Sequence, residues 1–155
     1  MKRILKLALI IIGIAFVVIQ FFRPDRTNPP VDPTRSIFAV TQVPPDIAAL
    51  LKNSCFDCHS NETHWPFYSN VAPASWLVAD DVHEGRRHLN FSEWGTYSAR
   101  KQASKMDKIR DEVDEGGMPL PKYLLLHRNA KLSAGDRKAI IDWAAKQGRG
   151  GDAEE

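Results

Sequence analysis

The sequence predicts an all-α protein, and this prediction depends on two helical patterns and on the lack of a strand pattern. Between residues 98 and 115, apolar residues recur at intervals of three or four, which places them on one face of a helix. Residues 133–136 have the spacing of a capping box, which predicts the start of a last helix that ends at Gly148. No stretch alternates apolar and polar residues as a half-buried strand does.

Two further helices are expected earlier in the chain. Asp46 is a suitable N-cap for a short helix in which Ile47, Leu50 and Leu51 share one face, and this helix runs into the only two cysteines. Residues 75–87 form the second candidate, with a less regular apolar spacing. Helices are therefore predicted on both sides of the cysteines.

The N-terminal segment predicts a transmembrane helix. Residues 4–22 are mainly apolar, with Lys6 as their only charge, and a helix needs about 20 such residues to cross the hydrocarbon core. The excess of positive charge before this run favours export of the part that follows it. A cleavable signal peptide is the alternative, but the sequence FVVIQFFRP offers no small-x-small cleavage site. We therefore expect residues 1–22 to be an uncleaved signal anchor, single-pass in a bacterial inner membrane, with the C-terminal domain in the periplasm.

Composition divides the remainder of the chain. Residues 23–45 contain six prolines, which favour extended backbone and predict a semi-rigid, Pro-rich tether. Residues 46–147 are long enough for one small domain, and residues 148–155 are expected to be a flexible tail. Four of the 21 Lys and Arg residues precede Pro24 and all 19 Asp and Glu residues follow it, so the exported part has a net charge of about −2. This balance argues against a nucleic-acid partner.

The sequence CFDCH, residues 55–59, is the candidate functional motif, and three kinds of site are considered for it. A thioredoxin-type disulfide is possible outside the cytosol, but that motif normally opens a helix after a strand. A zinc site needs four ligands, and the chain has no second cysteine pair and no regularly spaced histidine pair. The third kind is covalent haem c, for which C-x-x-C-H is the attachment motif. Cys55 and Cys58 would bond the two vinyl groups, and His59 would be the proximal iron ligand.

Met118 is the candidate for the second axial iron ligand. It lies between glycines and prolines in GGMPLP, just after the third predicted helix, so a stiff loop could hold its thioether against iron. Met106 belongs to the apolar face of that helix and is expected to be core. One alternative is that the second axial position of the iron is open or bound by water, and the other is that a second histidine occupies it. The remaining histidines are His64, His83, His88 and His127.

Aromatic and basic residues cluster after the motif. The aromatic residues are expected to form core and, in so small a domain, part of the wall around a haem. Arg86 and Arg87 could pair with haem propionates, since a guanidinium matches a carboxylate, or could form a solvated helix end.

Residues 40–147 resemble the bacterial haem-binding domain family. The resemblance is carried by CFDCHSNETHWPFYSN, NFSEW, GGMPLPKYLLLHRNAKLS and AIIDWAA. It implies a cytochrome c-like helical fold around one covalent haem, with Cys55, Cys58 and His59 as haem c ligands. The order of helix, CxxCH, later methionine and final helix is also similar to small class I cytochromes c, in which Met118 matches the distal ligand. The stretch from HWPFYS to NFSEW departs from that simpler pattern.

The function predicted from the sequence is that of a membrane-anchored mono-haem c-type cytochrome that passes single electrons. No protein nucleophile or acid–base pair is visible, so no catalytic residue and no enzymatic activity are predicted. The implied partners are the inner membrane, a cytochrome c maturation machinery and an unidentified redox protein. The alternatives are a five-coordinate haem sensor or peroxidase-like protein, and a haem subunit of a larger membrane complex.

Overall fold

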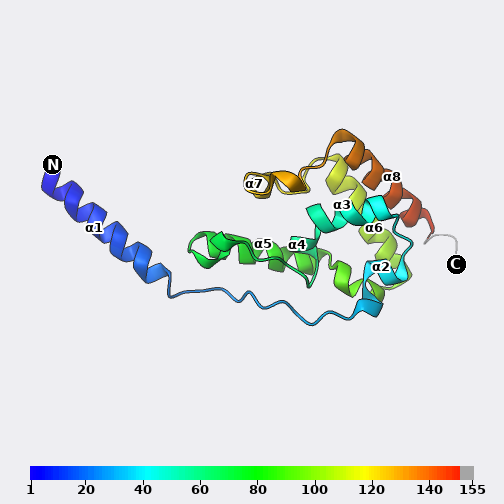
Figure 1. Ribbon diagram of the computed structural model, residues 1–155, viewed down its shortest axis with the longest axis horizontal. Coiled ribbons are helices and arrows are strands. Elements are labelled where there is room, and N and C mark those ends of the chain that lie inside the picture. The colour runs from blue at the N-terminus through cyan, green and yellow to red at the C-terminus, as the bar shows by residue number, and fades with distance from the viewer. Residues whose placement is uncertain (151–155) are drawn as a thin grey trace.

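The computed structural model describes residues 1–150, in which all regular secondary structure is helical, and this confirms the all-α class (Figure 1). Residues 1–150 contain no β-strand. The longer helices are α1 (Lys2–Ile19), α3 (Pro45–Ser54), α5 (Ala74–His88), α6 (Ala99–Asp114) and α8 (Ala134–Gly150). Short α-helices are α2 (Ile37–Val40), α4 (Phe56–His59) and α7 (Pro121–Leu124), and 3₁₀ helices are η1 (Pro33–Arg35), η2 (Phe67–Asn70), η3 (Phe91–Thr96) and η4 (Arg128–Ala130).

The two helices predicted from regular patterns form where expected. The Ser98 side chain caps α6 by accepting a hydrogen bond from Lys101 N at 3.4 Å, and Met106 on this helix is buried. The capping box of α8 is closed in both directions, because Asp136 N donates to Ser133 Oγ at 3.1 Å and Ser133 N donates to Asp136 Oδ2 at 2.9 Å. Both local predictions are confirmed.

The end of α8 differs from the prediction. The helix continues through Gly148 to Gly150, and Gly148 is buried against α6. A Cβ at Gly148 would lie 3.2 Å from Asp107 Oδ1, so the glycine permits close packing of the two helices and does not end α8. The predicted tail, residues 148–155, therefore begins inside α8, and residues 151–155 lie outside the described range.

The N-terminal helix α1 stands apart from the rest of the chain (Figure 1). It has 18 residues, three of which are the basic residues Lys2, Arg3 and Lys6, and none is buried. Within residues 1–150, no helix combines the length and the apolarity that a bilayer crossing requires. The prediction that residues 1–22 form a transmembrane anchor is therefore not supported.

The predicted tether, residues 23–45, is only partly extended. It contains η1 and α2, and the Ile37 side chain of α2 is fully buried in the core. Pro44 is the N-cap of α3 and Pro45 is its first residue, a position where proline costs no hydrogen bond. Asp46 lies in the first turn, so the prediction that it caps this helix is wrong. The second half of this segment thus belongs to the folded domain.

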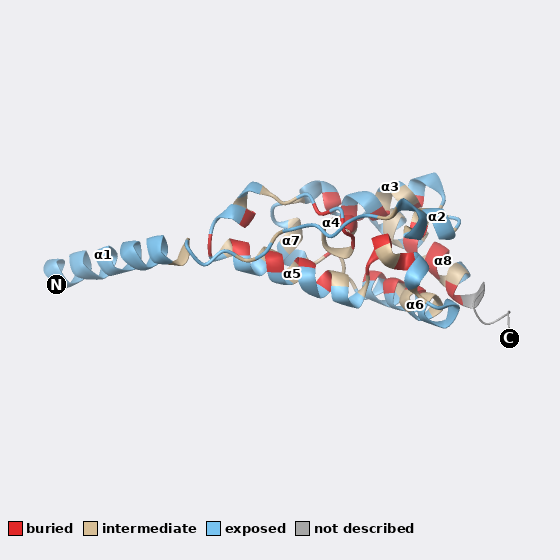
Figure 2. Cartoon of the chain, turned by 90° about the horizontal axis from the view of Figure 1, so that it is seen from below, coloured by how far each residue is buried: buried red, intermediate tan, exposed pale blue. Residues whose placement is uncertain are grey.

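The core has a helical part and an aromatic part. Buried residues gather where α3, α6 and α8 meet, next to α2 (Figure 2). Beside them a row of aromatic rings runs from α2 through α4 to η3. The ring centroids of Phe38 and Phe56 are 5.3 Å apart, those of Phe56 and Phe91 are also 5.3 Å apart, and Phe91 stacks on Trp94 at 6.3 Å. Because Phe56 lies inside CFDCH, this row fixes the cysteine-bearing turn to the core.

Met106→Ala should lower the free energy of unfolding by about 2–5 kcal/mol, because it leaves a cavity in a close-packed core. Urea denaturation followed by circular dichroism would measure this change. Lys108→Ala, an exposed position on the same helix, is the matched control and should change the free energy by less than about 0.5 kcal/mol. Equal effects of the two substitutions would contradict the assignment of Met106 to the core.

Candidate functional site

Both cysteines and the histidine of CFDCH lie on one turn of helix. Cys55 joins the end of α3 to the start of α4, and its carbonyl accepts hydrogen bonds from Cys58 N at 3.2 Å and His59 N at 2.9 Å. Both thiols are free. Burial raises the pKa of the Cys55 thiol to about 12, and burial together with the Asp81 and Asp57 carboxylates raises the pKa of Cys58 to about 11. Raised pKa values are the opposite of those of reactive redox cysteines, which argues against the thioredoxin-type alternative.

The His59 imidazole is oriented by two backbone carbonyls of the end of α5. Its Nδ1 lies 2.9 Å from Gly85 O and 3.1 Å from Leu89 O. A carbonyl oxygen can only accept, so Nδ1 carries the proton and Nε2 keeps a free lone pair. Burial lowers the pKa of His59, which favours the neutral ring. A neutral imidazole with one nitrogen fixed by hydrogen bonds and the other bare is the form that binds a metal.

Gly85 allows α5 to approach this turn. A Cβ at this position would lie 2.5 Å from Cys58 O and 3.2 Å from Cys58 Cβ, distances at which a side chain cannot fit. The backbone of α5 therefore packs directly on the backbone of α4, which brings the Gly85 carbonyl within reach of His59. Sequence analysis did not identify Gly85, because a glycine inside a helical segment gives no local indication of what lies beside it.

Arg86 also fixes the site, in a role that sequence analysis did not predict. Its Nε donates to Ser60 O at 2.7 Å and its Nη2 donates to Thr63 Oγ1 at 2.8 Å. Arg87 instead pairs with Glu84. Both guanidinium groups that were expected to pair with haem propionates are therefore bonded within the chain. The Arg86 guanidinium holds the segment that follows His59.

A buried polar network holds the same segment from the other side. Asn61 N donates to Ser92 Oγ at 3.0 Å, and Asn90 Nδ2 donates to Asn61 Oδ1 at 2.8 Å. All three residues are buried, and Ser92 N in turn donates to Asn90 Oδ1 at 3.0 Å. Because buried hydrogen bonds are costly to break, this network ties the turn to η3.

The loop that carries Met118 is fixed at both ends. Gly116, with a φ of 76°, ends α6, and Met118 N donates to Glu112 O at 3.1 Å. Past the loop, Tyr123 on α7 donates from its hydroxyl to Asp57 Oδ2 at 2.8 Å, and Asp57 lies inside CFDCH. The half-buried Met118 therefore lies on the loop between α6 and α7, and α7 is bonded to the cysteine-bearing turn. Its role as a ligand stays a prediction.

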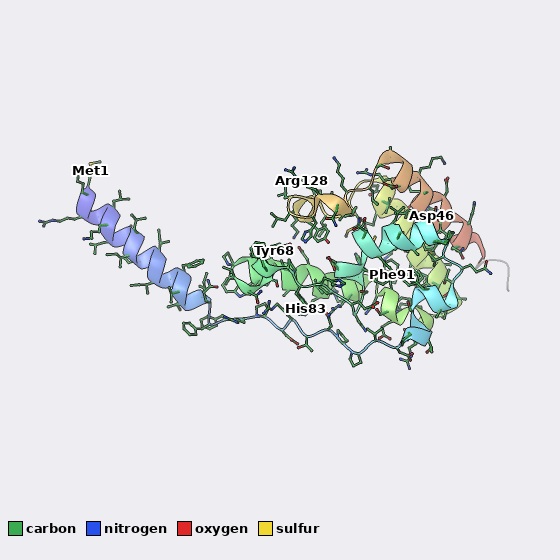
Figure 3. All side chains as sticks on the ribbon, viewed as in Figure 1. Met1, Asp46, Tyr68, His83, Phe91 and Arg128 are labelled. Carbon is green, nitrogen blue, oxygen red and sulfur yellow. The ribbon has the colours of Figure 1, made fainter. Side chains whose placement is uncertain are left out.

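The other histidines have different surroundings. His64, His83 and His88 are exposed, and His64 Nδ1 is 3.5 Å from Asp57 Oδ1. His127 is half-buried and stacks on Tyr123 with a centroid distance of 4.0 Å. Its Nδ1 lies 3.4 Å from the hydroxyl of Tyr68, a residue labelled in Figure 3 at the η2 end of α5.

The donor set of the turn fits a covalently attached haem better than a zinc ion. Within the described residues, no group of three or more His, Cys, Asp or Glu side chains could hold a metal ion. Two free thiols and one imidazole with a bare Nε2 supply two attachment points and one axial ligand. The two hydrogen bonds to Nδ1 thus leave His59 Nε2 available to a metal, as a ligand role would require.

Comparisons with known proteins agree with this donor set. A family model described as "Haem-binding domain" matches residues 14–146. The chain is also 30% identical over 101 residues to a protein of Escherichia coli (strain K12) named cytochrome c peroxidase Ccp. That match covers 63% of this chain and 22% of the E. coli protein. No solved structure matches the chain.

Gly85→Ala should destabilise the domain by about 1–3 kcal/mol, as overpacking does, because the added methyl would push α5 away from Cys58. Urea denaturation would measure the loss. Gly135→Ala in α8 is the matched control, since its Cβ would meet only Ser133 Oγ at 3.7 Å. The close approach would be disproved if both glycine substitutions were equally harmless.

Proposed function

The chain belongs to the haem-binding domain family, and from this premise we propose that it is a mono-haem c-type cytochrome that transfers single electrons. The observation that carries the proposal is the orientation of His59, whose Nδ1 is held by Gly85 O and Leu89 O while Nε2 stays free. Cys55 and Cys58, on the same turn, would be the covalent attachment points, in thioether bonds to the haem vinyl groups.

A bound haem would supply one-electron redox chemistry at its iron. The protein's part is to hold the ligands. The aromatic row fixes Phe56, α5 fixes the ring of His59, and Arg86 fixes the segment after it. Met118, on the loop between α6 and α7, would be the distal ligand. A thioether favours ferrous iron, so methionine–histidine ligation raises the reduction potential.

A peroxidase-like activity is the second candidate function. The similarity to the E. coli protein named cytochrome c peroxidase favours it, although the match covers 22% of that protein. The two functions differ at the sixth coordination position of the iron. An electron carrier keeps a protein ligand there, whereas a peroxidase or a sensor needs an open position.

The proposed location is the periplasmic side of a bacterial inner membrane. Covalent haem attachment would require a cytochrome c maturation machinery, and an unidentified redox protein would exchange electrons with the domain. The exposed apolar side chains of α1 support attachment to a lipid bilayer, because such a surface is unfavourable in water. We propose that α1 attaches the protein to the membrane.

Cys55→Ala and Cys58→Ala should each reduce covalent haem, because each removes one thioether bond. A haem stain on a denaturing gel, after expression with a maturation system, would measure attachment. Asn53→Ala, at an exposed position on the preceding turn, is the control and should retain wild-type staining. Wild-type protein that folds without haem would refute the proposed cofactor.

Met118→Ala should open an axial position, so that the ferrous protein binds carbon monoxide and the reduction potential falls. Met118→His should restore six-coordination at a lower potential than wild type. Absorption spectra and redox titration would measure both effects, with Met106→Ala as the control that leaves the ligand spectrum unchanged. Carbon monoxide binding by the wild-type protein would favour the peroxidase-like function.

A further inference from the structure

The C-terminal end of α1 is bonded to a distant part of the chain, the corner between η2 and α5. Gln20 makes two hydrogen bonds with the backbone of Ala72, since its Nε2 donates to Ala72 O at 3.1 Å and Ala72 N donates to its Oε1 at 2.9 Å. This pairing satisfies both ends of the amide. Figure 1 shows the junction where the chain leaves α1 and passes the η2 end of α5.

Two further contacts strengthen the junction. Trp76 Nε1 donates to Phe22 O at 2.6 Å. Arg26 Nη1 donates to Ser69 Oγ at 3.0 Å and to Asn70 Oδ1 at 2.8 Å. These bonds and the pairing of Gln20 with Ala72 join α1 to the domain, so α1 does not end in a free linker.

The junction exposes a group of large apolar side chains, which we name the apolar corner. Phe21 and Phe67 are 83% and 84% exposed, and Leu77 is 60% exposed. The full group is Phe21, Phe22, Phe67, Val71, Trp76 and Leu77. It continues the exposed apolar surface of α1, so one apolar surface extends from the helix onto the domain.

We propose that the apolar corner lies against the same lipid bilayer to which α1 attaches, and that this contact holds the domain on the membrane in one orientation. This inference rests on the attachment of α1 to a bilayer proposed above. Large apolar side chains are exposed along the length of α1, from Ile4 to Val18, so no face of the helix is reserved for a protein partner. Lipid, in contrast to a protein partner, can contact every face of α1. Tryptophan beside phenylalanine, with the exposed Arg23 nearby, is the composition of a membrane–water boundary.

The proposed contact would set the distance between the lipid surface and the iron ligands. Helix α5 begins at the apolar corner and carries Gly85, which holds His59. Eleven residues separate Ala74 from Gly85, a rise of about 16 Å along the helix. The His59 turn would therefore be held away from the lipid by a rigid helix, where a redox partner can reach it.

The test uses a photoreactive phenylalanine analogue, benzoylphenylalanine, placed at one position at a time in residues 1–155. The haem-loaded protein is reconstituted in phosphatidylcholine–phosphatidylglycerol vesicles, and covalent lipid adducts are counted by mass spectrometry. Position 11 on α1 tests the attachment, position 67 tests the apolar corner, and position 40 is the matched control. Val40 is 47% exposed but lies on α2, at the end of the domain far from α1 (Figure 1).

Lipid adducts at positions 11 and 67, with severalfold fewer at position 40, are the expected result. Gln20→Ala should reduce the adducts at position 67 and leave those at position 11, because it loosens only the junction. Adducts at position 11 without adducts at position 67 would contradict the proposed contact of the apolar corner with lipid. The attachment of α1 to the bilayer would still be supported. Equal adducts at positions 67 and 40 would also contradict the proposed contact of the apolar corner with lipid. The absence of adducts at position 11 would contradict both the attachment of α1 and the contact of the apolar corner.

Discussion

The backbone contact between α5 and the Cys55–His59 turn is the constraint on which the site depends. Because Gly85 has no side chain, the two backbones meet, and Gly85 O reaches His59 Nδ1 at 2.9 Å. The second acceptor, Leu89 O, is available because α5 ends at His88. Gly85 and the C-terminal end of α5 thus determine that Nδ1 of His59 is hydrogen-bonded and that Nε2 is not. Arg86 and the Asn61–Asn90–Ser92 network then hold the chain that leaves the turn, so the imidazole cannot rotate freely.

The features that could be predicted from the sequence are those that depend on neighbours along the chain. The CFDCH turn, the capping box of α8 and the buried face of α6 are local patterns, and each forms as predicted. Gly85, by contrast, is explained only by Cys58, which lies on another helix. Arg86 shows the same limit, because its charge suggested a carboxylate partner whereas its acceptors are oxygens of Ser60 and Thr63. Contacts between distant segments leave no periodic pattern from which they could be predicted.

The N-terminal part of the chain shows how two local patterns can hide a long-range arrangement. The apolar run predicted a separate anchor, and the prolines predicted a separate tether. In the structure, Ile37 is buried in the core and Gln20 is bonded to Ala72. The segment before the cysteines is therefore packed against the domain at both of its ends, and composition alone does not show such packing.

With Met118 as the proposed distal ligand, the loop after α6 would determine which chemistry the site supports, because its freedom to move would set whether an axial position can open. Met118 N is bonded to Glu112 O at one end of this loop. At the other end, the hydroxyl of Tyr123 is bonded to the carboxylate of Asp57, and Lys122 pairs with Asp81 on α5 at 2.7 Å. Asp57 lies between the two cysteines, so the loop and the cysteine-bearing turn are fixed to each other. A ligand on such a loop would stay in place in both oxidation states of the iron, which suits electron transfer. An enzyme that opens this position would first have to break the bonds of Tyr123 and Lys122, and the electron carrier therefore requires less rearrangement of the chain.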